Sequence, residues 1–217
     1  MSLEELLPTL VAVAIFIVVA FPVHEFSHAF AAFKLGDSTA RYQGRLTLNP
    51  VKHFDPLGGL ILIATAFLGR GFMIGWAKPT PVNPYNLRYG RRGEALVALA
   101  GPLSNLAMAA AVAIPLRVIA MDEARLLAMA ADPAGFFVLR VAEIFIRINV
   151  ILMIFNLLPI PPLDGWRVLL GLVPARTAYT LRPFEPYGFV VLLLIVIAGG
   201  SFLSGAINAV MRFLLGL

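Results

Sequence analysis

The chain has 217 residues, of which 60% are hydrophobic and 13% are charged. Soluble domains have about 45–50% apolar and about 25% charged residues, so this composition excludes an ordinary soluble enzyme and indicates a polytopic membrane protein. Because cysteine is absent, the chain has neither disulfides nor thiolate ligands, and any metal must be bound by His, Asp or Glu. The net charge of +5 does not indicate a nucleic-acid partner, because the basic residues cluster in loops beside apolar segments.

The first apolar segment covers residues 6–33 and is predicted to be the first membrane span. Its stretch Leu10–Phe21 carries no charge and is long enough, with its flanks, to enter the hydrocarbon layer. Pro22 removes one helical hydrogen bond and is expected to distort the helix there. Glu4 and Glu5 stand where a signal peptide has basic residues, so we do not expect a cleaved leader.

The sequence His24-Glu25-Phe26-Ser27-His28 lies at the end of this segment and has the form H-E-x-x-H. On a helix, residues four apart lie on one face, so both imidazoles can bind one Zn²⁺. Glu25, beside the first histidine, can then take a proton from water at the metal. Two of the three histidines of the chain belong to this pattern. The sequence therefore predicts a zinc site with one metal ion and Glu25 as its base.

The next three segments connect the first span to the second. Residues 37–53 are amphipathic and basic, and a short hairpin is possible over residues 39–48. Residues 54–76 are apolar but interrupted by Gly and Pro, which leaves open whether they cross the membrane or re-enter on the same side. In the following loop, residues 77–84 are rich in proline and are expected to be extended. This segment is predicted to position substrate, although a rigid linker is an equally good interpretation.

The remaining chain is predicted to be helical apart from its loops. Spans are expected over residues 94–121, 136–158 and 187–211, with Gly199-Gly200 weakening the last, and shorter helices over 123–135 and 166–173. The predicted fold is an all-α polytopic membrane protein with about five to six membrane segments. A re-entrant or hairpin region is expected between the first and second strong spans.

The orientation in the membrane follows from the distribution of Lys and Arg. The loops 34–53 and 78–92 are basic, whereas residues 122–132 are acidic on balance. Cytoplasmic loops carry the excess of Lys and Arg, so the basic loops are expected in the cytoplasm. The H-E-x-x-H motif then lies toward the cytoplasmic side.

A third metal ligand is needed, because catalytic zinc sites normally have three protein ligands. Asp164 is the best candidate, since it follows a proline-rich, non-helical stretch at the end of a span, at a depth similar to that of the histidines. Two alternatives remain: Asp164 caps the helix that begins at Gly165, or His53 supplies the ligand.

Three polar residues are candidates for contact with substrate. Asn105 and Asn156 could donate hydrogen bonds to the oxyanion or to the substrate backbone, or they could simply join neighbouring helices. His53 could carry protons in the same cavity, or it could be a histidine of an interfacial loop. Arg140, Glu143 and Arg147 share one helix face and are predicted to form an ion-paired stripe.

Several motifs, taken together, resemble the site-2 protease family of intramembrane zinc metalloproteases. They are His24–His28, Gly101-Pro102-Leu103-Ser104-Asn105, and the stretch from Asn156 through Pro159-Ile160-Pro161-Pro162 to Asp164-Gly165, in the order of the family. The stretches 48–56 and 75–84 are similar to a compact prokaryotic subgroup without appended domains. The resemblance covers roughly residues 20–170.

The resemblance implies zinc bound by His24, His28 and Asp164, with Glu25 as general base. It also implies cleavage of membrane-spanning protein substrates within or near the bilayer of a prokaryotic cell membrane. We expect a single domain over residues 1–217, with a catalytic core at about 6–173. The lipid bilayer and a transmembrane protein are the expected partners. The alternatives are a metal or ion transporter and an inactive scaffold that binds membrane helices; the oligomeric state is not predicted.

Overall fold

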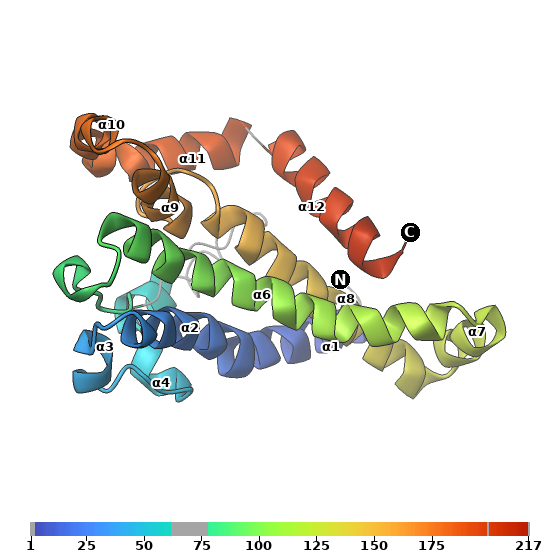
Figure 1. Ribbon diagram of the computed structural model, residues 1–217. Coiled ribbons are helices and arrows are strands. Elements are labelled where there is room, and N and C mark those ends of the chain that lie inside the picture. Colours follow the sequence, from blue (N-terminus) through green and yellow to red (C-terminus); the bar gives the residue numbers. More distant parts are fainter. Residues whose placement is uncertain (1–2, 62–77, 199, 217) are drawn as a thin grey trace.

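The computed structural model describes residues 3–61, 78–198 and 200–216 (Figure 1). Within these ranges the chain forms helices and connecting turns, without a strand, which confirms the all-α prediction. The principal helices are α1 (Leu3–Ile15), α2 (Phe21–Lys34), α6 (Arg91–Ala120), α7 (Glu123–Ala131), α8 (Pro133–Asn156), α9 (Asp164–Leu172), α10 (Ala175–Leu181), α11 (Gly188–Ala198) and α12 (Gly200–Leu215).

The first predicted span is a helical path from α1 to α2 through η1, a π-helical turn at Phe16–Ala20. The π turn ends directly before α2, which has Pro22 in its first turn. Proline lacks the N–H that would donate to the carbonyl four residues earlier. The α-helical hydrogen-bond pattern is therefore interrupted here, and the chain forms a wider π turn instead. The predicted distortion is therefore placed just before the metal-binding motif.

Helix α6 is the centre of the fold, because α2, α8 and α9 all pack against it (Figure 1). Small residues allow this close packing: Ala109 and Ala113 of α6 are fully buried against Ile146 and Val150 of α8. Met211 of α12 joins the same cluster from the C-terminal end. Close approach through alanine is typical of helices that pack inside membranes.

In the part of the chain that the structure describes, two helical stretches are long and apolar enough to cross a membrane, Leu6–Lys34 and Arg91–Ala120. Only 22% of the most apolar window in the first is buried, which a core helix of a soluble protein would not allow. Its exposed residues include Leu10, Ile17 and Val18. An exposed apolar surface of this kind requires lipid around it, so the chain is a membrane protein.

The structure contradicts the hairpin that was possible over residues 39–48. A single helical turn, α3 (Thr39–Tyr42), takes its place, and a second turn, α4 (Pro50–His53), follows. The carboxylate of Asp37 accepts hydrogen bonds from both the backbone N–H and the hydroxyl of Thr39, which starts the first turn. Gly44, at φ +67°, then reverses the chain. The weak alternation of the sequence was therefore overridden by local turn chemistry.

The single span predicted over residues 187–211 is replaced by α11 and α12, which lie on either side of residue 199 and run in different directions (Figure 1). Glycine disfavours a helix interior by about 1 kcal/mol per residue, and two glycines stand together at this point. Most of the 54–76 segment lies outside the described residues, so its crossing or re-entry stays a prediction.

Helices α7 and α8 lie close to where helices were predicted, over residues 123–135 and 136–158. Asp132 accepts a bond from Gly135 N at 2.8 Å and caps α8, whose first residue is Pro133. On α8, Glu143 lies 2.8 Å from Arg140 and 3.7 Å from Arg147, which confirms the ion-paired stripe.

Candidate metal centre

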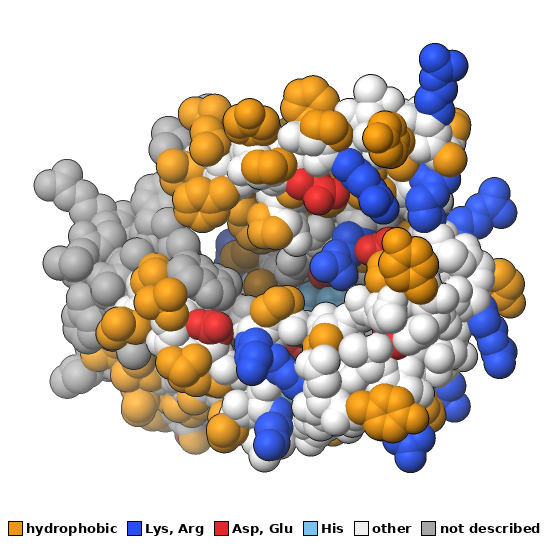
Figure 2. Space-filling model, turned by 90° about the vertical axis from the view of Figure 1, so that its left-hand side faces the viewer, with side chains coloured by type: hydrophobic (Ala, Val, Ile, Leu, Met, Phe, Trp, Pro, Cys, Tyr) orange, Lys and Arg blue, Asp and Glu red, His pale blue; other side chains and the backbone are white. Residues whose placement is uncertain are grey.

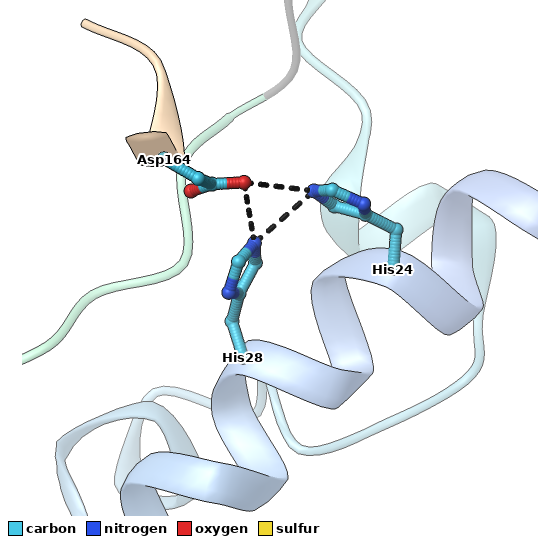
Figure 3. Close-up of side chains that lie close together, drawn as sticks. All are labelled: His24, His28 and Asp164. Carbon is cyan, nitrogen blue, oxygen red and sulfur yellow. Dashed lines mark hydrogen bonds and ion pairs between the residues drawn. The ribbon is translucent and has the colours of Figure 1, made fainter. Parts of the chain in front are cut away.

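Three metal-ligating side chains converge between α2 and the start of α9 (Figure 3). The Nε2 atoms of His24 and His28 lie 3.1 Å apart, and Asp164 Oδ2 lies 3.4 Å from the first and 3.3 Å from the second. The two histidines come from successive turns of one helix, whereas the aspartate comes from a segment 136 residues later than His28. The structure thus brings together the three residues that the sequence predicted as ligands.

The other ring nitrogens of the two histidines both point to acceptors on α6. His24 Nδ1 lies 2.5 Å from Asn105 Oδ1, and His28 Nδ1 lies 2.8 Å from the carbonyl of Val97. Each Nδ1 therefore donates its proton to oxygen, which leaves an unshared electron pair on each Nε2. Two electron pairs and a carboxylate oxygen then face one another, a set that a bound metal ion or a proton between them satisfies. The donor set fits a metal ion.

A glycine allows α6 to approach this pair of histidines. A Cβ atom built on Gly101 would lie 2.3 Å from His28 Nε2 and 2.7 Å from His24 Cε1. Any side chain here would push the imidazoles away from their present positions. The glycine of the Gly101–Asn105 motif is thus explained by the space that the ligands need.

Asp164 is the first residue of α9, and its side chain points at the histidines rather than at the backbone (Figure 3). The N-cap position belongs to Leu163, so the capping alternative for Asp164 is wrong. Residues 157–163 form bends and turns, as expected for a proline-rich stretch. Behind the ligand, the indole N–H of Trp166 donates to Glu185 at 3.1 Å and ties this end of α9 to the following segment.

Glu25 is buried beside the ligands and has a partner that sequence analysis missed. The hydroxyl of Thr80 lies 2.7 Å from Glu25 Oε2 and donates to it. This contact fixes one carboxylate oxygen and leaves Oε1 to accept from elsewhere. Thr80 lies between two prolines in the segment predicted to position substrate. Nothing in the sequence indicates that its hydroxyl contacts Glu25.

The proline-rich segment is anchored on both sides of Thr80. Lys78 N donates to the carbonyl of His53 at 3.1 Å, and Asn83 N donates to Asp37 Oδ2 at 2.7 Å. Burial raises the pKa of the Asp37 carboxyl, but the hydrogen bonds from Thr39, Asn83 and Asn86 outweigh burial and hold its pKa below the ordinary value. Asp37 is therefore ionised at neutral pH and keeps the segment beside Glu25.

The other three candidate residues, His53, Asn105 and Asn156, lie in different environments. His53 is fully buried, and its Nε2 donates to the carbonyl of Thr47 at 2.8 Å; it lies outside the group of His24, His28 and Asp164 that could hold a metal ion. Asn105 is also fully buried, with His24 on one side and Asn149 on the other. Asn156 is half-buried at the end of α8. The roles of these three residues toward substrate stay predictions.

The centre opens toward one end of the molecule. Figure 2 shows a hollow on this face with histidine at its bottom and Lys and Arg side chains around it. The same end holds α3, α4, α9, α10 and the start of α6 (Figure 1). These elements and the loops next to them carry most of the basic residues, among them Arg41, Lys52, Arg91, Arg92, Arg167 and Arg176. Water can therefore reach the metal ligands from the basic end.

Comparison with known proteins places the chain in a family. The family model described as peptidase family M50 matches residues 118–199, a range that includes Asp164 but not the histidines. The chain is 41% identical over 194 residues to "Putative zinc metalloprotease YwhC" of Bacillus subtilis (strain 168), covering 88% of this chain and 81% of that protein.

Two mycobacterial relatives carry the same designation under the name Rip2. The one from Mycolicibacterium smegmatis is 32% identical over 177 residues, and the one from Mycobacterium tuberculosis (strain H37Rv) is 31% identical over 182 residues. The chain covers 62% and 64% of their lengths, and they cover 81% and 83% of this chain. No solved structure matches it significantly. The extent and identity of the match to YwhC show that the chain belongs to peptidase family M50, the site-2 protease family of metallopeptidases.

Proposed function

We propose that this metallopeptidase is an intramembrane zinc endopeptidase that cleaves membrane-spanning protein substrates within or near the bilayer. The observation that carries the proposal is the convergence of His24, His28 and Asp164, with Glu25 buried beside them, in a chain whose helices expose apolar surface. The names of its relatives, which specify zinc, support the choice of metal. A set of two imidazoles and one carboxylate, with a position left for water, is typical of catalytic zinc.

Each residue has a separate task in this proposal. Zinc, when bound, would lower the pKa of a coordinated water to about 7 and polarise the scissile carbonyl. Glu25 would accept a proton from the attacking water at Oε1, the oxygen that Thr80 leaves free, and return it to the leaving amine. Asn105 and Val97 hold the two imidazoles with their Nε2 atoms toward the metal.

The proposed arrangement in the membrane is a single domain with about five to six membrane segments and the basic end in the cytoplasm. The basic residues around the hollow in Figure 2 support this orientation. Water then reaches the centre from the cytoplasmic side of what we propose is a prokaryotic cell membrane. The substrate enters from the bilayer and must unwind locally, because an intact helix hides its carbonyls in hydrogen bonds.

Purified protein in lipid vesicles tests the function. The probe is a set of model transmembrane peptides, labelled at both ends, with a Gly-Pro pair at varied depth to weaken the helix. We expect cleavage at a peptide bond near the weakened site, loss of cleavage on chelation, and recovery with Zn²⁺. Transport of Zn²⁺ across the vesicle membrane without cleavage would favour the transporter. Stable peptide binding by zinc-loaded protein, without hydrolysis, would favour the scaffold.

We further propose that residues 78–83 position the unwound substrate. The segment has no regular secondary structure, is anchored at Lys78 and Asn83, and contacts Glu25 through Thr80. Replacing Pro79 and Pro81 with glycine, while keeping Thr80, should loosen the segment. We expect slower cleavage of a transmembrane peptide, with zinc binding and cleavage of a small soluble peptide spared.

The matched variant is Thr80→Val, which keeps both prolines but removes the hydroxyl that holds Glu25. It should slow cleavage of both substrates equally, because it acts on the base and not on substrate binding. An equal loss on both substrates in the double glycine variant, with the fold intact, would favour the linker interpretation and remove the segment from the substrate site.

A further inference from the structure

A line of buried amides connects the metal ligand His24 to the backbone of α8. Asn105 of α6 accepts from His24 Nδ1 through its Oδ1, at 2.5 Å, and donates from its Nδ2 to Asn149 Oδ1, at 2.9 Å. Asn149 in turn donates from its Nδ2 to the carbonyl of Phe145, at 2.9 Å. Both asparagine side chains are fully buried, so water does not compete for these bonds.

The direction of the whole line is determined at its far end. The carbonyl of Phe145 can only accept, so the amide nitrogen of Asn149 must face it. The oxygen of Asn149 then faces Asn105, whose nitrogen must turn toward it. The oxygen of Asn105 is left for His24, and it can accept only if Nδ1 of the imidazole carries the proton.

We infer that Asn149 is a positioning residue that sets the tautomer of His24 through Asn105. The inference rests on the proposed role of His24 as a zinc ligand. A metal binds the imidazole nitrogen that carries no proton, and Nε2 is the nitrogen that faces Asp164 and His28. With the opposite orientation of Asn105, its NH₂ group would donate to Nδ1 and the proton would lie on Nε2, where it blocks the metal.

His28 gives an internal comparison, because it is oriented by a different kind of partner. Its Nδ1 donates to the carbonyl of Val97, a backbone group that cannot exchange donor for acceptor. An asparagine can rotate its amide by 180° with little change of shape, so Asn105 alone would not determine the tautomer. The second asparagine on α8 supplies the missing constraint, and it makes one ligand depend on a helix that contributes no ligand itself.

The simpler explanation is that the Asn105–Asn149 pair only joins α6 to α8. Polar bonds of this kind are common between helices in membranes. If that were the whole role, loss of Asn149 would weaken the packing of α6 on α8 but leave the proton of His24 on Nδ1, as it leaves that of His28. The two explanations thus predict different behaviour of His24 and His28.

The experiment uses metal-free full-length protein labelled with ¹⁵N-histidine in detergent micelles. The chain has 3 histidines, so the spectrum is simple, and single His→Gln variants assign it. Two-bond ¹H–¹⁵N correlations distinguish the tautomers. In the unaltered protein we expect His24 with its proton on Nδ1. In Asn149→Leu, which keeps the branched shape but removes both polar atoms, we expect His24 to gain the Nε2–H tautomer while His28 is unchanged.

The same variants are then compared for zinc affinity by competition with a chelator. Loss of an outer-shell partner typically lowers metal affinity 10–100-fold, and we expect this loss in Asn149→Leu. Asn149→Asp should restore the affinity and the His24 signal, because a carboxyl oxygen still accepts from Asn105. The control is Asn208→Leu, an exposed position on α12 outside the line of amides, which should change neither.

Three results would overturn the inference. They are an Nε2–H tautomer of His24 in the unaltered protein, an unchanged His24 signal with unchanged zinc affinity in Asn149→Leu, and equal changes at His24 and His28. The first result is available even if Asn149→Leu does not fold. If His24 shows the expected tautomer but the unaltered protein binds no zinc, the amide line stands and the zinc proposal fails.

Discussion

Glu25→Gln is expected to abolish cleavage while the protein keeps its zinc. The amide cannot accept the proton that the reaction must remove from water, and loss of a general base costs about 10²–10⁴-fold in rate. The shape is conserved, and the amide oxygen can still accept from Thr80. His24, His28 and Asp164 are untouched, so the zinc content should stay at one per chain.

The measurement is cleavage of the labelled transmembrane peptide together with metal analysis of the same sample. Glu123→Gln makes the same chemical change at an exposed position on α7 and should leave cleavage unchanged. Near-normal proteolysis by Glu25→Gln would remove Glu25 from its assigned role. The inactive variant would also serve to trap membrane proteins bound as substrates.

Asp164→Ala is expected to lose both activity and most of the bound metal. It removes one of three ligands, and the carboxylate is the only negative charge in the set. A two-histidine site without it should bind zinc weakly and leave the metal open to rearrangement. We expect the zinc affinity and the cleavage rate to fall together.

Asp164→Asn separates this role from any helix-capping effect. Asparagine caps a helix about as well as aspartate, but it is a neutral and weaker metal ligand. Loss of zinc in both variants would support ligation, with helix content from circular dichroism as the check on folding. If Asp164→Ala keeps one zinc at unchanged affinity, Asp164 is not a ligand and His53 becomes the leading alternative.

The relation between sequence and structure differs along the chain. The long apolar stretches that end in α2 and form α6 were predictable as helices, because hydrophobic length alone requires a helix in the bilayer. Residues 39–48 were not, because weak alternation of polar and apolar residues says little beside a buried Asp37 that starts a helical turn. The sequence marked residues 187–211 as weakened at Gly199-Gly200, but it did not reveal that α12 packs against α6 and α8.

The candidate metal-binding residues were likewise predictable only in part. His24, Glu25 and His28 lie within one turn and a half of helix, so their geometry follows from the helical repeat. Asp164 could be named as a candidate, but capping and His53 stayed open until the fold brought its carboxylate within 3.4 Å of both imidazoles. Gly101 is a similar case, since only the contact of α6 with α2 shows why a side chain is excluded.

By itself, the sequence determined that the protein is helical and that it lies in a membrane, and it predicted that two histidines and a glutamate form half of a metal site. These features depend on composition and on spacing within one helix, which are local properties. Only the tertiary structure decided which residues surround that half-site. Thr80 meets Glu25 across 55 positions of sequence, and Asn149 reaches His24 through Asn105 across 125. Such contacts arise where distant segments pack together, and hydrogen bonds between residues so far apart leave no periodic pattern in the chain.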